Sequence, residues 1–74
     1  MLALRPNCEC CDCDLPPERE ARICSFECTF CAACGDGELR GRCSNCGGNL
    51  ERRPIRPAAM LVKHPASAER VVRK

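Results

Sequence analysis

Cysteine is the residue with the clearest chemical potential in this chain, with ten among 74 residues. Four of them lie in the segment 8–14, and the other six lie between Ile23 and Gly48. A cysteine can form a disulfide, bind a metal ion as its thiolate, or take part in redox chemistry. The spacing of the cysteines and the composition of the chain decide among these uses.

Eight of the cysteines form four closely spaced pairs, three with two intervening residues and one with three. Two thiolates at this spacing can share one ion on a tight turn, and a structural zinc site closes at four ligands in a tetrahedron. The sequence therefore predicts two four-thiolate sites that bind two zinc ions. The predicted ligands are Cys8, Cys11, Cys24, Cys28, Cys31, Cys34, Cys43 and Cys46.

The four pairs can combine in two ways. Neighbouring pairs can share an ion, or the first pair can join the third and the second pair the fourth, in a cross-braced arrangement. Only two residues separate Cys28 from Cys31, and this short connection favours cross-bracing, because adjacent pairs can then face opposite ways. The predicted sites are then Cys8, Cys11, Cys31 and Cys34 in one, and Cys24, Cys28, Cys43 and Cys46 in the other.

Cys10 and Cys13 are left over, and they form a further pair offset by two residues from Cys8 and Cys11. Either of them can therefore replace a member of the first pair. As free thiols they would lie beside a closed zinc shell. The alternative is redox or metal-exchange chemistry, because a nearby cation favours the reactive thiolate. His64 is expected on the surface, since eight thiols already fill two shells.

The apolar composition is poor. Leu, Ile, Val and Phe make up 13 of the 74 residues, below the roughly 20% typical of a packed core. Chains of this length bury little surface and need a covalent or metal staple. The first eight residues hold no apolar targeting stretch, so we expect a cytoplasmic protein that contacts no membrane. Thiols stay reduced in the cytoplasm, which favours metal binding over disulfides.

We expect two parts in the chain. Residues 1–50 form the predicted zinc-binding domain, and residues 51–74 form a basic, Pro-containing C-terminal segment that is partly packed or flexible. Residues 1–48 contain eight acidic and five basic side chains, whereas residues 49–74 contain two acidic and seven basic ones. Nucleic-acid binding through this basic segment is therefore an alternative function. The lack of Trp and Tyr removes the best residues for base stacking.

The secondary-structure signals are short. They predict a small metal-stabilised α+β fold with few regular elements. Thr29 is the predicted N-cap of a helix, with Phe26 and Phe30 spaced four residues apart around it. The last nine residues are expected to be poorly ordered. The expected elements are a strand within 21–26, a helix within 29–39, a glycine-containing turn at 43–48 and a helical turn or two within 58–64.

The order of cysteine pairs over residues 8–46 resembles that of the RING finger. The resemblance implies a cross-braced, treble-clef-like fold with short strands, one short helix after the third pair and an irregular C-terminal tail. The chain departs from the RING pattern at Cys28, where a histidine is usual. Asp12 and Ser44 stand where RING ubiquitin ligases carry an aliphatic residue and often a proline. The resemblance therefore extends to the metal scaffold and not to ligase activity.

The whole chain also resembles a bacterial family of small uncharacterised cysteine-rich proteins, a domain of unknown function. The resemblance implies zinc binding and a bacterial, cytoplasmic origin, but it implies no reaction and no partner. Cys13 departs from the pattern of that family. The segments that carry the resemblance are residues 4–11, 21–34, 43–48 and 52–59.

These observations do not favour an enzyme. A catalytic zinc keeps an open coordination position, whereas a four-thiolate site is closed. The carboxylates near the cysteines are expected only to solvate the anionic sites; they are Glu9, Asp12, Asp14 and Glu27. We therefore expect no catalytic residues, no organic cofactor and no small-molecule substrate.

The leading hypothesis is a structural zinc module that presents a surface to a protein partner. The candidate surface combines Phe26, Phe30 and Leu39 with the segment 52–62. This segment can instead pack on the zinc domain as a makeshift core, which the scarcity of apolar residues favours. The alternatives from other classes are nucleic-acid binding and a thiol-based redox or metal sensor.

Overall fold

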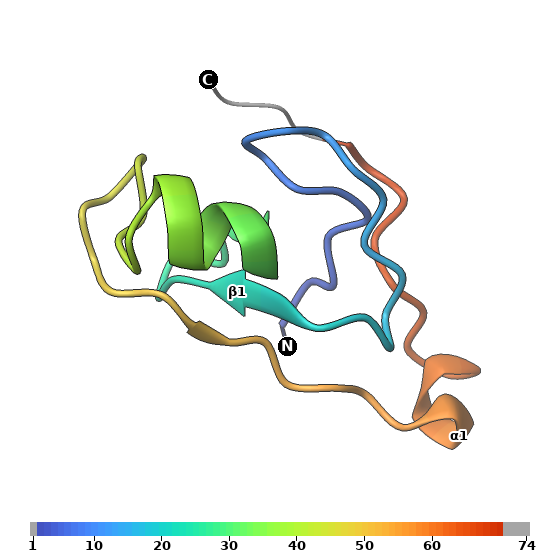
Figure 1. Ribbon diagram of the computed structural model, residues 1–74. Coiled ribbons are helices and arrows are strands. Elements are labelled where there is room, and N and C mark those ends of the chain that lie inside the picture. The colour runs from blue at the N-terminus through green and yellow to red at the C-terminus, as the bar shows by residue number, and fades with distance from the viewer. Residues whose placement is uncertain (1, 71–74) are drawn as a thin grey trace.

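The computed structural model describes residues 2–70, which form a small α+β fold (Figure 1). At its centre lies an antiparallel sheet of three short strands in the order β2-β1-β3. Two short helical segments accompany it, η1 directly after β2 and α1 in the C-terminal segment. The elements are β1 Ala21–Ile23, β2 Thr29–Cys31, η1 Cys34–Glu38, β3 Glu51–Arg52 and α1 Ala58–Leu61.

The hairpin of β1 and β2 separates two cysteine pairs that are adjacent in sequence. In its register Ile23 lies opposite Thr29 and Ala21 lies opposite Cys31. Cys24 and Cys28 therefore lie at the turn of the hairpin, whereas Cys31 lies at the other end of β2. At about 3.3 Å per strand residue, Cys28 and Cys31 are held roughly 10 Å apart. The strand predicted within 21–26 is confirmed for Ala21–Ile23.

The prediction of a helix capped by Thr29 is wrong. Thr29 and Phe30 lie in β2 and are buried, because β-branched and aromatic side chains fit a half-covered sheet and β1 supplies the pairing. Phe30 is 0% exposed, so its assignment to a partner surface is also wrong. The helical segment begins only after β2, and η1 starts at Cys34, the second cysteine of the third pair, which is close to the position that the RING resemblance implies.

Arg22 of β1 fastens η1 to the sheet. Its side-chain stem fills the space beside Gly35, where a Cβ atom would lie 2.6 Å from Arg22 Cγ. Only glycine allows this close approach. The Arg22 guanidinium donates to both carboxylate oxygens of Asp36, at 2.9 and 2.8 Å. These hydrogen bonds lower the pKa of Asp36, and Figure 1 shows η1 beside β1 as a result.

Cysteines make up about half of the core cluster. Its other members are few, and apart from Ala21 they are single large apolar side chains from separate segments, such as Leu15, Phe30 and Leu50. The cysteines of the cluster are Cys8, Cys24, Cys28, Cys31 and Cys43. The interior is therefore lined by sulfur where a larger domain would have aliphatic layers, as the composition indicates.

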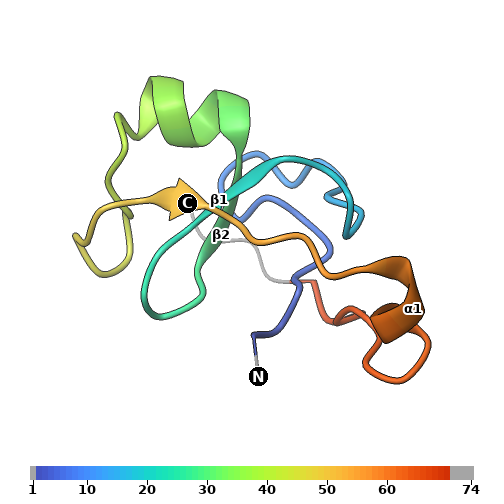
Figure 2. The same cartoon turned by 90° about the horizontal axis from the view of Figure 1, so that it is seen from below.

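The C-terminal segment packs along the N-terminal loop. Arg53 is 1% exposed, and its guanidinium donates to the carbonyl oxygens of Arg5 (3.0 Å) and Pro16 (3.1 Å). Further along, the Ser67 N–H donates to the Leu4 carbonyl at 2.9 Å. Figures 1 and 2 both show the chain from α1 onward running beside the first twenty residues.

The end of the described chain is held by charge. Arg70 forms ion pairs with Asp14 (2.8 Å) and Asp12 (2.9 Å) in the first cysteine loop. Residues 66–70, expected to be poorly ordered, thus include contacts with the body of the protein, and residues 71–74 lie outside the described part. The helical turn predicted within 58–64 is confirmed by α1, and His64 is exposed as expected. Within residues 2–70 no helix has the length and apolar character needed to cross a bilayer.

Candidate metal centre

Four sulfur atoms gather where the first cysteine loop meets the end of β2. We call this the N-terminal centre; its Sγ atoms belong to Cys8, Cys11, Cys13 and Cys31 and lie within 4.8 Å of one another. The sulfur atoms of Cys11 and Cys31 are 3.8 Å apart. Four sulfurs placed tetrahedrally at about 2.3 Å from zinc are also about 3.8 Å apart. The cluster therefore has the donor set and the dimensions of a four-sulfur zinc shell.

A second group lies at the turn of the hairpin, and we call it the C-terminal centre. The sulfur atoms of Cys24, Cys43 and Cys46 lie within 4.8 Å of one another. The Cys28 thiol lies beside those of Cys24 and Cys43, just outside the mutually close set. The second cysteine pair, Cys24 and Cys28, therefore lies next to the fourth pair, Cys43 and Cys46. Because the N-terminal centre joins the first pair to Cys31, the thiols gather by alternate pairs.

The turns that present the cysteines explain how they converge. The first and last cysteine loops share one backbone hydrogen-bond pattern. If the first cysteine of each loop is counted as residue one, its N–H donates to the carbonyl of residue six and its carbonyl accepts the N–H of residue five, at 2.8–2.9 Å. The fifth residue has a positive φ in both loops, at 64° and 77°. Such a φ suits glycine and is tolerated by aspartate. The residues are Cys8, Asp12 and Cys13 in the first loop, and Cys43, Gly47 and Gly48 in the last.

The first cysteine of every pair accepts a backbone N–H on its sulfur. The donor lies two or three residues further along the chain, so the backbone of each turn donates an N–H to the thiol of its first cysteine. A hydrogen bond to the charged form favours the thiolate, which is the form that binds metal. The contacts are Cys11 N to Cys8 Sγ (3.5 Å), Phe26 N to Cys24 Sγ (3.3 Å), Cys34 N to Cys31 Sγ (3.4 Å) and Asn45 N to Cys43 Sγ (3.3 Å).

The close packing of the thiols shifts their pKa values in opposite directions. The backbone N–H of Cys13 lowers the pKa of Cys11 to about 6. Burial, together with the neighbouring thiols of Cys11 and Cys31, raises the pKa of Cys13 to about 12. Burial also raises the pKa of Cys28 to about 11. Adjacent thiolates repel each other, so a bound cation is the natural counter-charge for such clusters.

The structure brings in donors that the sequence interpretation did not assign. Cys13 was left over, yet its sulfur lies in the N-terminal centre. The Cys34 thiol lies beside those of Cys31, Cys11 and Cys8. Its sulfur also forms a close group with the sulfur of Cys10 and a carboxylate oxygen of Glu38, and Glu38 is not among the ligands predicted from the sequence. The signal that indicates Glu38 is its spacing of four residues from Cys34 within the helix predicted for residues 29–39. Which sulfurs bind an ion stays a prediction.

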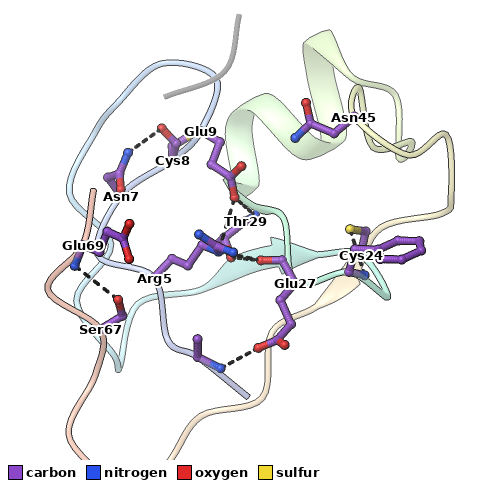
Figure 3. Close-up of polar contacts among 12 residues, drawn as sticks. Arg5, Asn7, Cys8, Glu9, Cys24, Glu27, Thr29, Asn45, Ser67 and Glu69 are labelled. Carbon is purple, nitrogen blue, oxygen red and sulfur yellow. Dashed lines mark hydrogen bonds and ion pairs between the residues drawn. The ribbon is translucent and has the colours of Figure 1, made fainter. Parts of the chain in front are cut away.

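Glu9 has a structural role in addition to the expected solvation of a metal site. It is 1% exposed, accepts the Thr29 N–H at 2.6 Å and lies 3.7 Å from Arg5 Nε (Figure 3). Glu27 has a similar role, because its carboxylate accepts the Ala3 N–H at 2.6 Å and its carbonyl accepts from Arg5 Nε at 3.1 Å. These two carboxylates tie the N-terminal segment and the first cysteine loop to the hairpin.

Comparison with known proteins places the chain in a family. The family model described as a protein of unknown function (DUF1272) matches residues 1–56. An uncharacterized protein of Rhizobium meliloti (strain 1021), R02474, is 65% identical over 74 residues, which cover 99% of this chain and 88% of that protein. No solved structure matches the chain. The predicted membership of a small bacterial cysteine-rich family is thereby confirmed, and the chain belongs to the DUF1272 family of proteins of unknown function.

Proposed function

We propose that this protein is a structural zinc module whose interleaved thiolate centres replace a hydrophobic core and support a surface for a protein partner. The observation that carries the proposal is the gathering of sulfur by alternate pairs, with spacings that fit a four-sulfur shell. An all-sulfur tetrahedral shell suits zinc, which has no redox chemistry of its own. A closed shell leaves no position for a substrate, so the proposed role is structural and not catalytic.

The zinc count per chain tests the first half of this proposal. Native mass spectrometry of the reduced, untagged protein should show at least two zinc ions bound to each chain, because two separate sulfur clusters are present. Cys31→Ser and Cys43→Ser should each lower the count, since each removes a member of a different cluster. A chain that carries no zinc, or a mass deficit from disulfides, would overturn the proposal.

The partner surface is centred on Phe26 at the tip of the hairpin. Its side chain is 73% exposed. It borders a hollow of about 320 Å³, whose wall also includes Arg5, Asn45 and the C-terminal-centre residues Cys28 and Cys46. Exposed aromatic residues beside a concave surface are typical anchors of protein interfaces. The metal centre would hold this tip rigid.

The basic segment supports nucleic-acid binding less well. Arg53 is buried, and Arg56 donates to the carbonyl oxygens of His64 and Leu2, both at 2.6 Å. Arg70 is paired with acidic residues of the first loop. Three of the basic residues on which that alternative depends are thus used within the protein, and a protein partner is the function we retain.

Substitution at the tip tests the second half of the proposal. Phe26→Asp should leave the zinc count and the circular dichroism unchanged, because the side chain lies outside the core. It should also abolish cross-linking to whichever protein of a Rhizobium meliloti lysate the wild-type chain captures. Val62→Asp, at another highly exposed apolar position, is the matched control and should retain the cross-link. If both variants capture the same proteins as the wild type, Phe26 is not part of a partner surface.

A further inference from the structure

The N-terminal centre and its immediate neighbours contain more donor atoms than one zinc ion can use. A tetrahedral zinc shell closes at four ligands, and Cys8, Cys11, Cys13 and Cys31 already supply four close sulfur atoms. Directly beside them lies a second group, formed by the sulfur atoms of Cys10 and Cys34 and a carboxylate oxygen of Glu38, all within 4.8 Å of one another. Six thiols and a carboxylate thus converge on one small region.

The placement of this second group follows from η1. Cys34 and Glu38 are its first and last residues, and positions four apart lie on one face of a helical segment. Cys10 reaches the same face from the first cysteine loop, with its sulfur 3.6 Å from Glu38 Oε2. The helical segment and the loop therefore present three metal-binding atoms to the same point.

The two groups also touch each other. The Cys34 thiol lies beside those of Cys31, Cys11 and Cys8, which all belong to the four-sulfur group. Two tetrahedral ions need eight coordination positions, whereas the two groups contain seven donors. One thiolate that bridges both ions completes the count, and the Cys8 and Cys11 thiols next to Cys34 are placed to provide it.

We propose that the N-terminal centre is binuclear, so that the chain binds three zinc ions in all. One ion is bound by Cys8, Cys11, Cys13 and Cys31, and the other by Cys10, Cys34, Glu38 and a bridging thiolate. This inference rests on the proposed zinc-binding function and extends it. It gives a role to Cys10, Cys13 and Glu38, which a module with two mononuclear sites does not use.

Zinc stoichiometry of selected variants tests the binuclear centre. The full-length reduced protein is titrated with zinc and counted by native mass spectrometry. Three ions are expected for the wild type, and two for Cys10→Ser and for Glu38→Ala, with unchanged circular dichroism. Glu18→Ala, which removes another exposed carboxylate, is the matched control and should keep three ions.

Cobalt substitution gives an independent reading of the same centre. The chain has no Trp or Tyr, so sulfur-to-cobalt charge-transfer bands stand clear of aromatic absorption. These bands should saturate at three equivalents in the wild type and at two in Cys10→Ser. Saturation at two equivalents in both, or a third ion kept by both Cys10→Ser and Glu38→Ala, overturns the binuclear centre and leaves the zinc module intact. A wild type without bound metal overturns both.

Discussion

Removal of metal should unfold this protein at neutral pH. A strong chelator, added under reducing conditions, is expected to abolish the amide dispersion of the NMR spectrum and the folded circular dichroism signal. Structural zinc contributes on the order of 10–16 kcal/mol of apparent binding free energy at pH 7. The net stability of a small domain is only about 5–15 kcal/mol, and here about half of the core cluster is cysteine. Metal binding and folding are therefore expected to be one event.

The control for this experiment is the choice of ion added back. Zinc should restore the folded spectrum, whereas magnesium should not, because it prefers oxygen ligands and keeps its water. Reducing conditions are needed since all ten cysteines are free thiols in the structure, and oxidation would mask the effect of the metal. A native spectrum that persists in protein verified to contain no metal would refute the account of the core.

Arg53→Ala should destabilise the zinc-loaded protein. The side chain is buried, and its two terminal nitrogens bind the carbonyl oxygens of Arg5 and Pro16. The Arg5 carbonyl would lose this donor, whereas the Pro16 carbonyl also accepts the Arg19 N–H at 3.0 Å and stays paired. An acceptor left without a donor away from water costs about 1–3 kcal/mol, so we expect the free energy of unfolding to fall by about 1–3 kcal/mol. Urea unfolding of the zinc-loaded protein, followed by circular dichroism, measures this loss.

Arg52→Ala is the matched control, because Arg52 is the exposed neighbour of Arg53 in the same segment. Exposed substitutions of this kind usually change stability by less than about 0.5 kcal/mol. Both variants should retain the wild-type zinc count, since neither residue belongs to a sulfur cluster. Equal stability of the two variants would mean that Arg53 does not fasten the C-terminal segment to the N-terminal loop.

The gathering of alternate pairs could be predicted because it depends on local geometry. The two-residue connection between Cys28 and Cys31 favours pairs that face opposite ways, and the hairpin carries the two cysteines to opposite ends of β2. The last turn was equally predictable, since Gly47 supplies the positive φ that the loop needs. In both cases the deciding feature is a short segment, the connection from Cys28 to Cys31 and the turn at 43–48.

The rest of the structure depends on distant contacts that no local pattern encodes. A helix was expected at Thr29 because Phe26 and Phe30 have helical spacing, but pairing with β1 makes a strand and separates the two side chains, one exposed and one buried. Arg53 has the sequence environment of a solvated charge, yet its partners lie 48 and 37 residues away. Such contacts override local propensity.

The central claim, that the cysteines are shared between two interleaved centres, is tested most directly by cadmium NMR. In protein loaded with ¹¹³Cd, scalar couplings between each cadmium and the Cys Hβ protons identify the ligands of every ion. Cys8 and Cys31 are predicted to couple within one centre, and Cys24, Cys43 and Cys46 to a cadmium in the other. A spectrum in which Cys31 and Cys43 couple to the same cadmium, while Cys8 and Cys24 couple to another, would show that neighbouring pairs combine and would contradict the account.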